Sequence, residues 1–109
     1  MIGRRAHWTL AVLALLLGLG HMSFLAAAPR WSPDVAWFAG TGLAFILGGL
    51  LSIAAIRARD DRLVRGAAAV GALLLAGFAL AVWTVVPQPQ VIAAGVLFAA
   101  LAGLAAFRR

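Results

Sequence analysis

Two histidines, His7 and His21, carry the side chains of this 109-residue chain with the widest range of possible chemistry. An imidazole can ligate a metal or haem iron, carry a proton, or make structural hydrogen bonds. The two residues are 14 positions apart in the sequence. They therefore differ by about 40° around a helix and are separated by about 21 Å along its axis, which places them on one helix face.

The spacing of His7 and His21 resembles that of the membrane cytochromes b, in which two histidines of one helix each ligate one of two stacked haems. The resemblance covers these two residues alone. Ligation of each iron by two histidines requires partner histidines on a facing helix, and the sequence has none. A two-fold dimer, or Met22 as an axial ligand, would have to complete the site. We expect no cofactor, and a haem-binding electron-transfer subunit is the third of three functional hypotheses.

His21 interrupts the apolar stretch GLGHMSF. It lies about 12 Å inside the helix end that precedes Pro29, and Thr41 enters from the same side at a similar depth. A hydrogen bond to Thr41, or to a carbonyl one turn earlier, would make a neutral imidazole tolerable at this depth. We expect His21 to be a helix–helix hydrogen-bonding residue. It would be functional only if a second subunit supplied its partner, because no acidic residue lies within any apolar run.

The sequence contains no pattern of catalytic residues. It has no cysteine, no Ser-His-Asp set, no HExxH, no phosphate-binding glycine loop and no pair of catalytic carboxylates. The adjacent Asp60 and Asp61 stand among four arginines, which favour ion pairing over a bound cation. We therefore expect neither catalytic residues nor a metal site, and we do not expect an enzyme.

The composition indicates a membrane protein. The chain is 65% hydrophobic and 11% charged, whereas soluble domains are about 25% charged. A transmembrane helix needs ~20 residues, and the chain has four apolar runs near this length, at about residues 6–28, 35–56, 63–86 and 91–107. Turn residues separate the runs, with Ser32 and Asp34 as competing N-caps of the second. We predict an all-α membrane protein in which residues 1–109 form a single domain of four transmembrane helices in two antiparallel hairpins.

The arginines predict the orientation of the chain. Eight of the nine fall on one side of the predicted hairpins, and Arg30 alone falls on the other. Because basic loops stay in the cytoplasm, both termini are expected to be cytoplasmic, in a bacterial inner membrane. The net charge of +6 is then a topology signal, and no nucleic-acid partner is expected. A cleaved signal ending at Ala26–Ala28 is the competing interpretation, which Pro29 and the length of the run oppose.

Tryptophans are expected to anchor the helices at the two membrane boundaries. Trp8 is expected at the inner boundary, and the outer boundary is expected to hold Trp31, Trp37 and Trp83.

Small residues recur every four positions in the second predicted helix and, more briefly, in the fourth. Such ridges let helix backbones approach closely in lipid. They are interpreted either as packing within the chain, with the second helix against the fourth, or as an interface with another molecule. The ridge residues are Ala36, Gly40, Ala44, Gly48 and Ser52, followed by Gly95, Ala99 and Gly103.

The first functional hypothesis is a small inner-membrane protein that acts through helix–helix association in the lipid bilayer. It would be an accessory subunit or a self-associating scaffold, with a homo-oligomer or a membrane protein as its partner. The second hypothesis is a minimal homo-oligomeric transporter or channel. Its path would be lined by the intramembrane polar residues, which are His21, Ser23, Thr41 and Thr84.

Overall fold

A computed structural model describes residues 2–107, and Met1, Arg108 and Arg109 lie outside the described residues. The two C-terminal arginines used to predict the orientation are therefore not placed. The described chain is helical, with α1 (Ile2–Ala27), α2 (Pro33–Arg57), α3 (Arg62–Trp83) and α4 (Pro89–Phe107) joined by short turns. Each helix is long and apolar enough to cross a membrane. The chain is thus a multi-pass membrane protein.

Side-chain oxygens define the starts of α2 and α3. Ser32 is the N-cap of α2, where its hydroxyl accepts a hydrogen bond from the Val35 amide at 3.3 Å and Pro33 follows as the first helical residue. Of the two competing caps, Ser32 therefore acts and Asp34 lies in the first turn. Asp61 caps α3 by accepting hydrogen bonds from the next turn of backbone amides.

Most helix ends lie within two residues of the ends of the apolar runs in the sequence, and two differ by three residues or more. α1 begins at Ile2, before the expected residue 6, because arginines are good helix formers and do not stop a helix at its polar end. α3 ends at Trp83, before the expected residue 86. Thr84 and Val85 instead close tight turns onto carbonyls three residues earlier. Pro87, which has no amide hydrogen and restricts the residue before it, prevents the helix from continuing.

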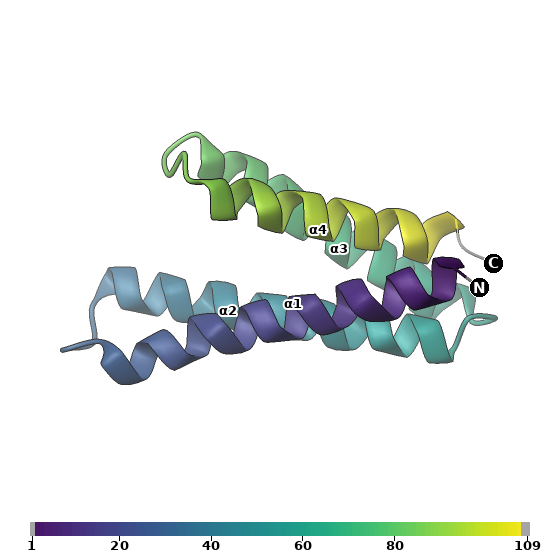
Figure 1. Cartoon of the computed structure of the whole chain (residues 1–109), viewed down its shortest axis with the longest axis horizontal. Coiled ribbons are helices and arrows are strands. Elements are labelled where there is room, and N and C mark those ends of the chain that lie inside the picture. The colour runs from purple at the N-terminus through teal and green to yellow at the C-terminus, as the bar shows by residue number, and fades with distance from the viewer. Residues whose placement is uncertain (1, 108–109) are drawn as a thin grey trace.

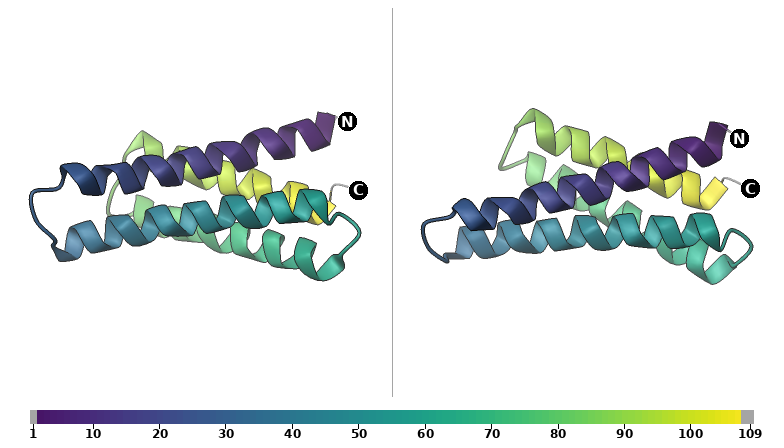
Figure 2. Two further views of the ribbon diagram at one scale, coloured as in Figure 1. Left: turned by 90° about the horizontal axis from the view of Figure 1, so that it is seen from below. Right: turned by 60° about the horizontal axis from the view of Figure 1, so that its bottom comes forward.

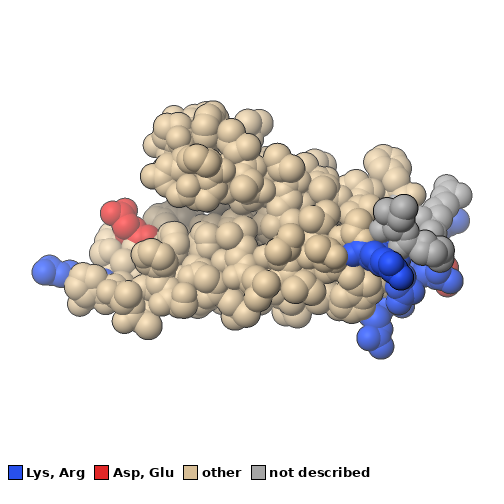
Figure 3. Space-filling model, viewed as in Figure 1, with Lys and Arg blue, Asp and Glu red and all other residues tan. Residues whose placement is uncertain are grey.

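The helices form two hairpins that diverge toward one end (Figures 1 and 2). α1 packs along α2 and α3 packs along α4, and the contacts between the two pairs are fewer. One end of the 45 Å molecule holds the start of α1, the end of α4 and the 58–61 turn. We call it the arginine end, because most arginines gather there (Figure 3). The opposite end, called the turn end, holds the 28–32 and 84–88 turns.

α1 packs against α2 along a line of residues spaced three and four apart, called the small-residue seam here because glycines, alanines and a serine make up most of it. On α1 the seam runs through His7, Ala11, Ala14, Gly18 and His21, and on α2 through Gly42, Phe45, Gly49, Ser52 and Ile56. A Cβ atom built on Gly18 would lie 2.7 Å from the Gly42 carbonyl oxygen, and one built on Gly42 would lie 2.8 Å from the His21 Cβ. The two backbones are therefore in direct contact, and only glycine fits at these positions.

The two hairpins join through larger side chains, from the middle of the bundle toward the arginine end. Phe98 and Leu101 of α4 are fully buried in one cluster with Phe45 and Ile56 of α2. The rings of Phe45 and Phe98 lie 5.0 Å apart between centroids. Both the aromatic contact and the apolar cluster hold the hairpins together at this level.

Arg65 fastens the α3–α4 hairpin at the arginine end. Its guanidinium donates hydrogen bonds from Nε to the Ala105 carbonyl at 3.2 Å and from Nη2 to the Ala106 carbonyl at 3.0 Å. These carbonyls belong to the last turn of α4, which has no helical partners for them. A cation at this position also complements the helix dipole.

Candidate functional site

A cleft opens between the two hairpins at the turn end, where the space-filling surface is hollowed (Figure 3). Its volume is about 520 Å³, and residues of all four helices line it. Ala79 and Ala94 form part of the wall that the α3–α4 hairpin contributes, and Phe45 of α2 lines the deep end of the cleft. The cleft ends where the hairpins meet at the Phe45–Phe98 contact.

Most of the cleft surface is apolar, and a few polar groups lie along it. The apolar side chains come from both hairpins and include Leu17, Phe38, Phe78, Val82 and Val91. The polar lining residues are His21, Asp34, Thr41, Gln88 and Gln90. A concave apolar site with a small number of polar groups is the usual form of a small-molecule binding site.

His21 is held rigidly in the cleft wall. Its Nδ1 lies 2.9 Å from the Leu17 carbonyl oxygen, one turn earlier on α1. Because a carbonyl can only accept, Nδ1 carries the hydrogen of this bond. The ring stacks on Phe38 at 4.4 Å between centroids and meets Phe45 edge-to-face at 5.1 Å. His21 therefore contacts α2 through its ring.

The expected hydrogen bond between helices at His21 is not formed. Thr41 donates its hydroxyl hydrogen to the Trp37 carbonyl at 3.0 Å on its own helix, and His21 bonds within α1. Of the two partners considered for His21, the carbonyl one turn earlier is the one observed. Each side chain bonds a carbonyl of its own helix and not the other side chain, because that carbonyl is within reach without any movement of the helices.

The predicted polar residues divide into two pairs. His21 and Thr41 both line the cleft. Ser23 and Thr84 are exposed and do not line it, and each donates to a carbonyl three residues earlier on its own helix, Gly20 for Ser23 and Ala81 for Thr84. A path along the four predicted polar side chains is therefore not formed within one chain.

Sequence reasoning missed three polar residues of the cleft mouth, Asp34, Gln88 and Gln90. Gln90 donates its amide hydrogen to the side-chain oxygen of Gln88, so these two form one polar unit. The signal for all three was present, since the sequence places the 29–34 and 87–90 turns on the same side of the membrane.

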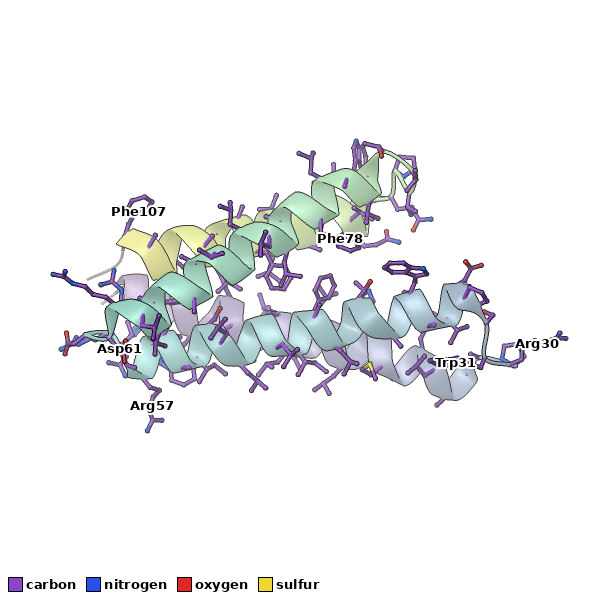
Figure 4. All side chains as sticks on the ribbon, turned by 180° about the vertical axis from the view of Figure 1, so that it is seen from behind. Arg30, Trp31, Arg57, Asp61, Phe78 and Phe107 are labelled. Atoms are coloured by element: carbon purple, nitrogen blue, oxygen red, sulfur yellow. The ribbon has the colours of Figure 1, made fainter. Side chains whose placement is uncertain are left out.

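Asp34 brings a negative charge to the mouth of the cleft. It is exposed in the first turn of α2 and lines the opening. Acidic atoms are visible beside the hollow at the turn end (Figure 3). Arg30, in the preceding turn, extends beyond the end of the helices and away from the cleft (Figure 4).

His7 lies in the bundle interior, with only 1% of its surface exposed. The position of His7 beside Arg4 and Arg5 in the sequence favours an exposed, interfacial side chain, and its burial corrects this interpretation. His7 continues the small-residue seam of α1 two heptads before His21, and this face turns inward. The two histidines share a face as the spacing predicts, but His7 does not line the cleft.

The small-residue ridge of α2 enters the interior of the bundle only in the half of the helix nearer the arginine end. Gly40 is exposed, and a Cβ built on it would meet nothing within 4 Å. Gly48 packs against α3 and α4, since its Cβ would lie 2.8 Å from Leu75 and 3.0 Å from Phe98, and Ser52 is buried. Ala36 and Ala44, like Gly48, are half-buried. A four-residue step advances by about 40° around the helix, so the ridge winds from one face to another.

The shorter ridge of α4 lies mostly away from α2. A Cβ atom built on Gly95 would lie 3.4 Å from the Ala79 Cβ of α3, and one built on Gly103 would meet nothing within 4 Å. Ala99 is exposed. The interpretation of ridge-to-ridge packing between the second and fourth helices is therefore not what is observed, and α2 contacts α4 only sparsely.

The tryptophans lie at both ends of the bundle. Trp31 and Trp37 at the turn end are 71% and 72% exposed, and Trp37 also lines the cleft. Trp83 ends α3 at the same end. Trp8 lies toward the arginine end, half-buried against the core.

No protein-family model, curated protein or solved structure matches the chain. Within residues 2–107, no group of three or more His, Cys, Asp or Glu side chains is arranged to hold a metal ion. The cleft is thus the concave site to which the geometry points.

Proposed function

We propose that this is a bacterial inner-membrane protein that binds an apolar or amphiphilic small molecule in the cleft, as a ligand-binding or transport unit. Both termini would be cytoplasmic and the cleft would open toward the outer leaflet. The orientation is supported by the arginines that the structure describes, since Arg4, Arg5 and the 57–65 segment lie at one end and, of these arginines, only Arg30 lies at the other.

The cleft itself is the observation that carries this proposal. Its volume of about 520 Å³ falls in the range of about 300–1,000 Å³ typical of ligand sites. An apolar recess of this size in a membrane protein does not stay vacant, because lipid chains or another apolar molecule fill it. The hairpins meet at the Phe45–Phe98 contact, so the cleft ends within the bundle. This geometry favours a binding pocket over a continuous pore through one chain.

The proposal is tested with an uncharged fluorescent apolar probe, N-phenyl-1-naphthylamine, and the purified protein in maltoside micelles. Saturable binding above that of empty micelles is expected. Thr41→Trp places a large ring in the cleft wall and should weaken binding by about tenfold or more, a loss of about 1.4 kcal/mol or more. The matched control is Leu43→Trp, which adds a ring to an exposed position of the same helix outside the cleft. Equal binding by both variants would overturn the proposal.

Association with another membrane protein or a second copy is the second candidate function. It is favoured by Gly40 and Gly103, where an added Cβ meets nothing within 4 Å, so that another helix could approach the backbone. Gly40→Ile with Gly103→Ile should then reduce oligomer size or partner recovery. Gly48→Ile cannot test this candidate, because Gly48 already packs against Leu75 and Phe98. Unchanged assembly of the double variant would contradict it.

The haem hypothesis receives the least support from the geometry. The His21 ring is stacked on Phe38 and bonded through Nδ1 to Leu17, and His7 is buried near the other end of α1. An absorbance spectrum of the purified protein tests the hypothesis directly, and a Soret band that His21→Ala removes would revive it.

A further inference from the structure

We infer that the cleft selects organic cations, meaning amines or quaternary ammonium or phosphonium compounds with an apolar body. This inference rests on the proposed function, because it specifies the charge of the molecule that the cleft would take.

The charge at the mouth of the cleft is negative. Asp34 lines it, whereas the other acidic residues, Asp60 and Asp61, lie in the turn at the arginine end. The described lining residues include no arginine or lysine, and Arg30 extends away (Figure 4). A cation at the mouth would therefore gain attraction from Asp34, and an anion would meet a carboxylate with no arginine or lysine among the described lining residues to offset it.

Aromatic residues follow this carboxylate along α2. Trp37 and Phe38 follow Asp34 by three and four residues on α2, which places all three on one helix face. Both rings line the cleft, as does Phe78 from the opposite hairpin. One face of the Phe38 ring is covered by His21, so Trp37 and Phe78 offer the more open faces. Aromatic faces attract organic cations, and a carboxylate next to them is the usual arrangement for binding an ammonium group.

The deeper part of the cleft suits the apolar body of such a cation. Val82 and Ala79 of α3 and Val91 and Ala94 of α4 face α2 across it. At the mouth, the bonded pair of Gln88 and Gln90 supplies neutral amide groups. A ligand would thus place its charged group near Asp34 and its apolar part between the hairpins.

A free organic cation fits these residues better than the ammonium headgroup of a phospholipid. A phospholipid would bring its phosphate close to Asp34, and the described lining has no arginine or lysine to neutralise that phosphate. The inference therefore commits to a cation without an attached phosphate.

The test compares tetraphenylphosphonium with triphenylphosphine oxide, an uncharged molecule with a similar aromatic body, by equilibrium dialysis in maltoside micelles. The native protein should bind the cation about tenfold or more tightly than the neutral compound. Asp34→Asn should lower the affinity for the cation to that for the neutral compound and leave the latter unchanged. The matched control is Asp60→Asn at the other end of the molecule, which should behave as the native protein.

Several outcomes would overturn the inference. Equal affinities of the native protein for the two compounds, or an equal loss of both in Asp34→Asn, would remove charge selectivity. Displacement of the cation by equimolar phosphatidylethanolamine would assign the cleft to lipid. In each case binding that Thr41→Trp abolishes would leave the proposed function standing. No saturable binding of either compound would overturn the inference and would count against the proposed function as well.

Discussion

At the scale of single residues, His21 contacts α2 through the faces and edge of its ring and bonds α1 through its Nδ1 atom. Its hydrogen bond stays within α1, whereas its ring lies against Phe38 and Phe45 of α2. The sequence places His21 and Thr41 at a similar distance from the turn end, because helix rise and turn positions determine both, and the two residues do line the same cleft. It could not predict which acceptor His21 uses, since that choice depends on side-chain rotamers and on the crossing of the helices.

The ring contacts predict that His21→Phe is tolerated and His21→Ala is not. Alanine removes the stack between α1 and α2 and should lower the free energy of unfolding by about 1–3 kcal/mol. Phenylalanine keeps the ring and should recover most of this loss, although the hydrogen bond to Leu17 is gone. The thermal unfolding midpoint in detergent measures the difference. If phenylalanine destabilises as much as alanine, the hydrogen bond is the main contribution.

At the scale of the helices, the spacing of the small residues decides what they do. The four apolar runs are enough to predict α1 to α4, because helices satisfy their own backbone in lipid. The four-residue ridge is conspicuous in the sequence, yet Gly40 remains open and only Gly48 and Ser52 reach the interior. The actual seam alternates steps of three and four residues and passes through Gly18, Gly42 and Gly49. In a chain rich in alanine and leucine, this pattern is hard to distinguish from its surroundings.

Two glycines of α2 provide a matched pair for testing the seam. At Gly42 a methyl group would lie 2.8 Å from the His21 Cβ and 3.1 Å from the Gly18 carbonyl oxygen. We expect Gly42→Ala to destabilise the protein by about 1–3 kcal/mol. At Gly40 there is open space, so Gly40→Ala should leave stability unchanged or raise it by up to about 1 kcal/mol. Thermal unfolding in detergent compares them, and equal effects would mean that the seam does not run through Gly42.

Arg65 makes a separate prediction for the end of α4. Arg65→Met removes both hydrogen bonds to the Ala105 and Ala106 carbonyls. The last turn of α4 should then exchange its amide hydrogens faster, by about 3- to 10-fold, since its carbonyls lose a charged partner. Arg62→Met, one turn earlier on α3, is the control. Unchanged exchange in Arg65→Met would show that the α3–α4 hairpin closes without this arginine.

At the scale of the whole molecule, the two ends of the bundle differ in packing and in charge. Buried Phe98 and Leu101 join the hairpins toward the arginine end, whereas the hairpins separate at the turn end (Figures 1 and 2). The pairing of neighbouring helices follows from short turns and is predictable. The cleft is not, because it depends on how side chains of one hairpin meet those of the other across long sequence separations.

The charge difference predicts which end faces the cytoplasm. The chain has no cysteine, so a single introduced cysteine reports its own position without background. Gln88→Cys at the turn end should react with a membrane-impermeant maleimide in intact cells whose outer membrane has been permeabilised. Asp60→Cys at the arginine end should react only after lysis, because the surrounding arginines stay in the cytoplasm. Replacing Asp60 leaves every arginine in place, and acidic residues contribute little to topology. Labelling of Asp60→Cys in intact cells would reverse the orientation and place the mouth of the cleft in the inner leaflet.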